Sequence, residues 1–100
     1  MADVKAHEIC AKAANLVGGD RHRTHGDKFE NFNNIAALWS AYLGIGLSPL
    51  QAANMMALMK VARTKTGSHN PDDYVDTAGY AGCAGEIAEI LQGAIGEETK

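Results

Sequence analysis

Three clusters of helix-terminating and helix-initiating residues divide this sequence, and they constrain the fold more than any other feature. Gly18-Gly19, Gly44 and Gly67 can end helices in the left-handed conformation, and Ser48-Pro49 and Asn70-Pro71 are typical of helix starts. Between these clusters, apolar residues recur every three or four positions, as in amphipathic helices. We therefore expect four helices, which run from about Asp3 to Val17, from Asp27 to Gly44, from Pro49 to Thr66 and from Pro71 to about Ile95.

The length of 100 residues fits one all-α domain, and we expect a compact four-helix bundle. No segment shows the alternating pattern of a strand. The chain is 46% hydrophobic but only 6% aromatic, and a small domain of this kind buries a modest fraction of its surface. Recurrent glycines in the last helix and the apolar outer side of the third helix, with Met55 and Leu58, add to this argument. We therefore expect self-association into a homo-oligomer.

The net charge of −3 argues against a surface for extended nucleic acid, which needs a basic stripe. Cys10 and Cys83 lack the spacing of a zinc site and lie in apolar helical segments, so we expect reduced, buried thiols. No segment is apolar and long enough for a signal peptide or a membrane span. These features predict a cytoplasmic protein that does not bind a membrane.

The charged residues of the third and fourth helices are predicted to face one interior. On a helical wheel, Lys60 and Arg63 flank Met56 on the side opposite the polar face. In the fourth helix, Asp76 falls within the apolar stripe that includes Tyr80, and Asp72 and Asp73 lie on its two shoulders, one turn earlier. An isolated buried carboxylate costs several kcal/mol, so Asp76 must be paired, protonated or metal-bound.

Each of these residues also has a purely structural interpretation. Asp72 and Asp73 lie in a first helical turn, where acids offset the helix dipole. Lys60 and Arg63 could form a stabilising ion pair with Asp76 and have no other role.

The start of the second helix offers a second group of candidates. Asp27 and Glu30 have the spacing of a capping box, and Asn31 shares Asp27's side of the helix as a wall or surface residue. The preceding segment holds two arginines and two histidines, among them Arg21, Arg23 and His25. Guanidinium groups and helix N-termini favour phosphate, although a solvated loop would have the same composition.

Several segments resemble a family of small phage-encoded proteins of unassigned function. The strings RTHGDKFENF, IAALWSAYLG, MMALMKVART and DDYVDTAGYAG carry this resemblance, which spans roughly residues 21–88. At a greater distance the arrangement is similar to MazG-like, all-α nucleotide pyrophosphohydrolases, which hold Mg²⁺ with carboxylates from two helices. The resemblance implies that Asp73 and Asp76 would stand for a Glu-x-x-Asp pair. The double-Glu helix motif of these enzymes is missing, and only Asp27 and Glu30 could replace it.

The leading hypothesis is a site for a phosphorylated nucleotide between the second, third and fourth helices. Asp76, Asp73 or Asp72, and Asp27 would hold Mg²⁺ through oxygen ligands. Phosphate would meet the cations, and further contacts would come from polar and aromatic side chains; these ligand-binding candidates are Lys60, Arg63, Arg21, Arg23, His25, Tyr80 and Asn31. In the enzyme version, Asp76 and Asp73 are catalytic, and a metal-activated water cleaves the α–β phosphoanhydride.

Two alternatives stay open. The first is a non-catalytic protein that sequesters a host nucleotide signal, such as a cyclic dinucleotide of a defence pathway. The missing double-Glu motif and the number of cations favour this version. The second is a structural or partner-binding bundle, in which the interior charges are stabilising pairs.

Overall fold

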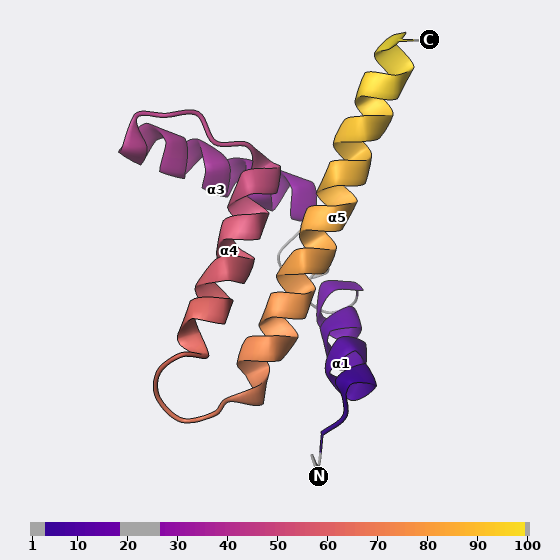
Figure 1. Cartoon of the computed structure of the whole chain (residues 1–100). Helices are drawn as coiled ribbons and strands as arrows, with labels where there is room; N and C mark the ends of the chain where they lie inside the picture. Colours follow the sequence, from indigo (N-terminus) through magenta and orange to yellow (C-terminus); the bar gives the residue numbers. More distant parts are fainter. Residues whose placement is uncertain (1–3, 19–26, 100) are drawn as a thin grey trace.

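The computed structural model describes residues 4–18 and 27–99, and side chains up to Gly93. Four helices make up nearly all of this part of the chain, and it contains no strand (Figure 1). They are α1 (Ala6–Gly18), α3 (Lys28–Leu43), α4 (Pro49–Arg63) and α5 (Pro71–Thr99). The all-α four-helix prediction is confirmed, with boundaries within about four residues of those expected.

The helix boundaries follow from local hydrogen bonds. The Asp27 side chain caps α3 by accepting from the backbone N–H of Glu30 at 3.1 Å. At the other end, Gly44 adopts φ 73°, and its N–H donates to the carbonyl of Ser40 at 2.8 Å. Positive φ is costly for residues with a Cβ, which explains why a glycine ends this helix.

Helices α4 and α5 both begin with a side-chain cap followed by a proline. Ser48 and Gln51 form a complete capping box, in which each side chain accepts a hydrogen bond from the other residue's backbone N–H. The side chain of Asn70 accepts from the N–H of Asp72 at 3.1 Å and so caps α5. A proline follows directly in both cases, at the first helical position.

The long helix α5 organises the fold. Helices α4 and α1 pack along different sides of its N-terminal half, and α3 crosses next to α4 (Figure 1). The C-terminal half of α5 extends beyond the other helices. The radius of gyration is therefore 15.3 Å, above the roughly 13 Å typical of a 100-residue domain.

The core lies where α3, α4 and α5 meet. It is built mainly from small side chains, which let the helices approach closely, and Phe32 and Ile87 are its large members. The buried cluster consists of Phe32, Ala36, Ala52, Ala53, Cys83, Ala84 and Ile87. Helix α1 contributes one buried residue, Ala13.

Two expectations about packing need correction. Cys83 is buried as predicted, but Cys10 is exposed, because α1 packs along a narrow side on which only Ala13 is buried. Of the three recurrent glycines, only Gly79 makes a close approach. A Cβ there would lie 3.3 Å from Val17 Cγ1, whereas Cβ atoms at Gly82 and Gly85 would meet open space. No helix in the described part of the chain combines the length and hydropathy that a membrane span requires.

Candidate functional site

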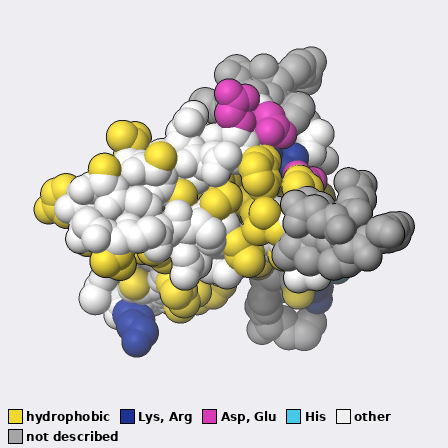
Figure 2. All heavy atoms as spheres, turned by 90° about the horizontal axis from the view of Figure 1, so that it is seen from above, with side chains coloured by type: hydrophobic (Ala, Val, Ile, Leu, Met, Phe, Trp, Pro, Cys, Tyr) yellow, Lys and Arg dark blue, Asp and Glu magenta, His cyan; other side chains and the backbone are white. Residues whose placement is uncertain are grey.

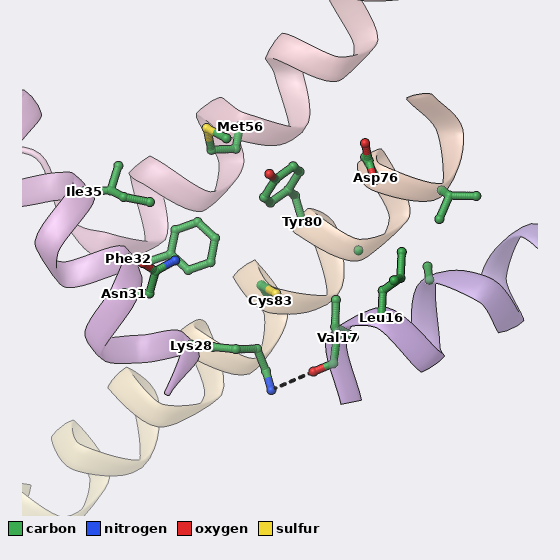
Figure 3. A pocket seen from close by; sticks show the side chains of 13 residues that line it. Leu16, Val17, Lys28, Asn31, Phe32, Ile35, Met56, Asp76, Tyr80 and Cys83 are labelled. Atoms are coloured by element: carbon green, nitrogen blue, oxygen red, sulfur yellow. Dashed lines mark hydrogen bonds between the residues drawn. The ribbon is translucent and has the colours of Figure 1, made fainter. Parts of the chain in front are cut away.

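A pocket of about 370 Å³ lies between all four helices (Figure 3). Its walls are largely apolar, and a few polar side chains from α3 and α5 reach it. This volume and this mixture are typical of small-molecule sites. The lining residues are Ala13, Leu16, Val17, Lys28, Asn31, Phe32, Ile35, Met56, Val75, Asp76, Gly79, Tyr80 and Cys83.

Helix α5 supplies the wall that carries most of the predicted site residues. Asp76, Tyr80 and Cys83 are four and three residues apart, so they share one face of the helix. The ring of Tyr80 meets Phe32 of α3 edge to face, with centroids 6.3 Å apart. This contact joins α5 to α3 within the pocket wall.

Asp76 is paired with a lysine from the neighbouring helix. Its Oδ2 atom lies 2.9 Å from Lys60 Nζ, and the two side chains are 28% and 16% exposed. The predicted meeting of opposite charges from the third and fourth helices is therefore confirmed for this pair. The carboxylate borders the pocket as half of an ion pair.

Asp73 and Arg63 form a second pair one turn towards the start of α5. Arg63 Nε lies 3.4 Å from Asp73 Oδ1. The prediction that Arg63 points into the interior is wrong: its side chain is 59% exposed, because α4 ends at this residue. Asp73 is instead the buried member, with a side chain only 9% exposed.

Lys28 forms the opposite end of the pocket, at the first residue of α3. Its Nζ donates to the carbonyl of Val17 at 3.2 Å (Figure 3) and lies 3.7 Å from Glu86 Oε2. The ammonium group thus links α3 to α1 and α5. Because the N-terminus of a helix carries partial positive charge, this end of the pocket favours an anion.

The acids predicted to hold Mg²⁺ are not assembled into one cluster. Asp72 is exposed and pairs with Lys12 at 3.4 Å, and Asp27 caps α3. Within residues 4–18 and 27–99, no three His, Cys, Asp or Glu side chains are gathered where they could share a metal ion. In the described part of the chain these acids therefore do not assemble a magnesium site, and magnesium binding stays a prediction.

The profile of the family described as "Domain of unknown function (DUF6378)" matches residues 8–88. The chain belongs to the DUF6378 family. The matched region of this DUF6378 chain contains every pocket residue and both ion pairs of the α4–α5 interface.

Two related proteins come from mycobacteriophages. The "Gene 55 protein" of Mycobacterium phage D29 is 42% identical over 84 residues, which are 84% of this chain and 56% of that protein. The protein of the same name from Mycobacterium phage L5 is 41% identical over 75 residues, or 74% and 48%. The DUF6378 chain thus spans about half the length of these relatives. Its resemblance to phage-encoded proteins is confirmed, and its likeness to MazG-like enzymes stays a prediction.

No solved structure matches this DUF6378 chain significantly. The predicted site residues thus have to be placed by the geometry alone. Asn31, Asp76 and Tyr80 line the pocket, and Lys60 borders it through Asp76. Arg63, Asp73, Asp72 and Asp27 lie outside its lining, and Arg21, Arg23 and His25 fall outside the described residues.

Sequence reasoning missed two groups of pocket residues in this DUF6378 chain. Lys28 was passed over because it lies inside an apparent capping box, where its neighbours explained the pattern. Leu16 and Val17 lie on the apolar side of α1, and nothing in the local sequence shows that this side faces a cavity. The one usable signal was Lys28 itself, a cation next to a helix N-terminus and adjoining the basic segment.

Proposed function

We propose that this chain binds a small phosphorylated nucleotide in the pocket between α1, α3, α4 and α5, and that it holds the nucleotide without hydrolysing it. The observation that carries the proposal is the convergence of polar groups from two helices on one largely apolar cavity. Asn31, Asp76 and Tyr80 line the same pocket, with Lys28 at one end (Figure 3), and the Asp76 carboxylate is held there by Lys60.

The apolar part of the pocket suits a nucleobase. Tyr80 contributes an aromatic ring to the wall, buried Phe32 packs against it edge to face, and Ile35 and Met56 complete the wall. The amide of Asn31 offers both a donor and an acceptor, which is what the edge of a base requires. The volume lies near the lower end for small-molecule sites, which favours a mononucleotide over a cyclic dinucleotide.

The phosphate would lie at the Lys28 end. The N-terminus of α3, which Asp27 caps, carries partial positive charge, and the Lys28 ammonium group would turn to the phosphate from Glu86 Oε2, 3.7 Å away. The segment that precedes Asp27 contributes Arg21, Arg23 and His25 to the sequence next to this end, and their contact with phosphate remains a prediction.

The state of the acidic residues supports binding over hydrolysis. Asp76 and Asp73 are each neutralised by a cation of α4, and Asp72 and Asp27 have separate roles. A magnesium-dependent pyrophosphohydrolase needs several carboxylates free to share the metal. In a protein related to phage proteins, binding without hydrolysis would lower the free concentration of a host nucleotide signal.

The test is a thermal-shift screen against nucleoside mono-, di- and triphosphates and cyclic dinucleotides, in EDTA and in Mg²⁺. We expect a ligand to raise the unfolding temperature in EDTA, because binding to the native state alone stabilises it. Chromatography of the recovered nucleotide should show it intact.

A matched pair of variants assigns the binding to the pocket. Asn31→Ala should weaken binding by roughly threefold to tenfold, the worth of a typical hydrogen bond. Asn33→Ala changes an exposed residue of the same helix outside the pocket and should leave binding unchanged.

Two other outcomes would overturn the proposal. Conversion of a nucleoside triphosphate to a monophosphate and pyrophosphate only in Mg²⁺ would establish the enzyme instead. No shift with any nucleotide would favour a structural bundle, in which Lys60–Asp76 and Arg63–Asp73 only stabilise the fold.

A further inference from the structure

The hairpin formed by α3 and α4 carries no charge over most of its length. Between Glu30 and Lys60 the sequence contains no Asp, Glu, Lys, Arg or His, although 21% of the whole chain is charged. This segment is nevertheless far from buried. Its exposed large apolar residues are Leu38, Tyr42, Leu43, Ile45, Met55, Leu58 and Met59. An exposed apolar surface of this size marks an interaction site.

Four residues of α3 form a continuous stripe within this surface. Asn31, Ile35, Leu38 and Tyr42 follow at helical spacing and so lie on one side of the helix. The first two line the pocket, whereas Leu38 and Tyr42 are 71% and 90% exposed. The stripe therefore begins at the pocket and continues into solvent along α3.

The charged residues lie elsewhere on the molecule. Figure 2 shows hydrophobic side chains among backbone and uncharged side chains over the part of the molecule formed by α3, with acidic side chains gathered away from it and a Lys or Arg side chain near its edge. The acids in the described part of the chain are found on α5, at the start of α3 and on α1. The apolar stripe is thus separated from most of the negative charge.

We propose that a second copy of this chain packs against the α3 stripe, with Leu38 and Tyr42 at the centre of the interface. Each copy carries a net charge of −3, so two copies repel unless they meet through surfaces without charge. The α3–α4 hairpin is such a surface. In a two-fold dimer the same patch faces itself, and a neutral apolar patch is complementary to its own copy.

The chemistry of the hairpin argues against two other occupants. Helices that lie on membranes carry Lys and Arg beside their apolar face, and the hairpin has none between Glu30 and Lys60. A charged protein partner would find no complementary charge there.

The exposed area is consistent with an interface of ordinary size. The chain exposes 7062 Å², whereas a folded monomer of 10.6 kDa exposes about 5,500 Å². This excess, to which the protruding C-terminal half of α5 contributes as well as the α3–α4 surface, is more than the ~800 Å² that each partner buries in a standard interface. Because Asn31 and Ile35 belong to the same stripe, the second copy would contact the rim of the pocket.

Sedimentation velocity of the unliganded chain over a wide concentration range tests this interface independently of any nucleotide. We expect the wild-type chain to approach twice its mass of 10.6 kDa as concentration rises. The double variant Leu38→Glu/Tyr42→Glu should weaken dimerisation by more than about a hundredfold, because it places charges in the centre of an apolar interface. The control Asn33→Glu adds a charge to the opposite side of α3 and should still dimerise.

The proposal fails if the wild-type chain sediments as a monomer at every concentration, or if the double variant dimerises like the wild type. A monomer that pellets with vesicles of phosphatidylcholine and phosphatidylglycerol would identify a lipid surface as the occupant instead. Far-UV circular dichroism should show equal helicity in all variants, since the substituted side chains are exposed.

Discussion

Lys60 Nζ lies 2.9 Å from Asp76 Oδ2, and this contact ties α4 to α5 beside the pocket. Both side chains are largely withdrawn from solvent. Removing one charge would therefore leave the other without its partner, in surroundings that solvate it poorly. A pair of this kind favours one relative position of two helices more than it stabilises the fold. It therefore holds the pocket wall that carries Asp76 and Tyr80 in a defined place.

We expect Lys60→Met to lower the free energy of unfolding by about 1–3 kcal/mol, because it leaves the Asp76 carboxylate without its cation. The double variant Lys60→Met/Asp76→Leu should recover much of this loss, since it removes both charges. Urea denaturation of the wild type, both single variants and the double variant measures the coupling. Losses that simply add would show that the two side chains do not depend on each other.

Two ion pairs of equal length should differ in their contribution to stability. Lys12–Asp72 and Arg63–Asp73 both measure 3.4 Å, but the first pair is exposed on both sides and Asp73 is buried. We expect Lys12→Ala to cost under about 0.5 kcal/mol, as for exposed pairs. Arg63→Ala should cost about 1–2 kcal/mol, because a buried carboxylate loses its partner. Equal losses in the free energy of unfolding, measured by urea denaturation of the two variants, would contradict this difference.

Gly79 and Gly82 of α5 should respond differently to alanine. Gly82→Ala should stabilise the chain by up to about 1 kcal/mol, because alanine favours a helix and the added Cβ meets open space. At Gly79 the added Cβ would lie 3.3 Å from Val17 Cγ1, so Gly79→Ala should gain less or lose stability. Thermal unfolding of the two variants shows whether Gly82→Ala is the more stable one.

A second substitution tests the cause of that difference. Val17→Ala removes the crowded methyl group, so Gly79→Ala should be better tolerated in that background than in the wild type. An unchanged effect of Gly79→Ala would mean that the contact between α1 and α5 is not what limits it.

Asp27 should behave as a helix cap. Its side chain accepts from the N–H of Glu30, so Asp27→Ala should cost about 1 kcal/mol, and Asp27→Ser should retain most of the stability. Ser48→Ala at the start of α4 provides a comparison with similar loss. If Asp27→Ser keeps the stability but abolishes a Mg²⁺-dependent ligand shift, Asp27 is a metal ligand as the sequence first indicated.

Features formed within one helix could be predicted from the sequence, whereas features that depend on how the helices pack could be predicted only in part. The caps at Asp27 and Ser48 were predictable, because the interacting atoms lie within one helical turn. The wheel also placed Lys60 and Asp76 in one interior, because both lie within long helices. It failed for Arg63, since a wheel contains no information about where a helix ends.

The pocket was predictable only in part for the same reason. Asn31, Tyr80 and Asp76 could be selected as polar or aromatic residues on interior faces. Leu16 and Val17 could not, because their contribution depends on how α1 docks against α5, which no periodicity encodes. Burial of Asp73 likewise depends on the end of α4 lying beside the start of α5.

Filling the pocket should separate ligand binding from stability. Ile35 lines the cavity and is half-buried, so Ile35→Trp should place an indole in the space that a nucleobase would occupy. We expect any nucleotide-induced rise in the unfolding temperature to disappear. The unliganded chain should keep its stability within about 1–2 kcal/mol, because the added ring enters an existing cavity. Ala37→Trp, at an exposed position of the same helix outside the pocket, should leave the nucleotide shift intact. A ligand shift that survives Ile35→Trp at full size would place the binding site elsewhere on the molecule.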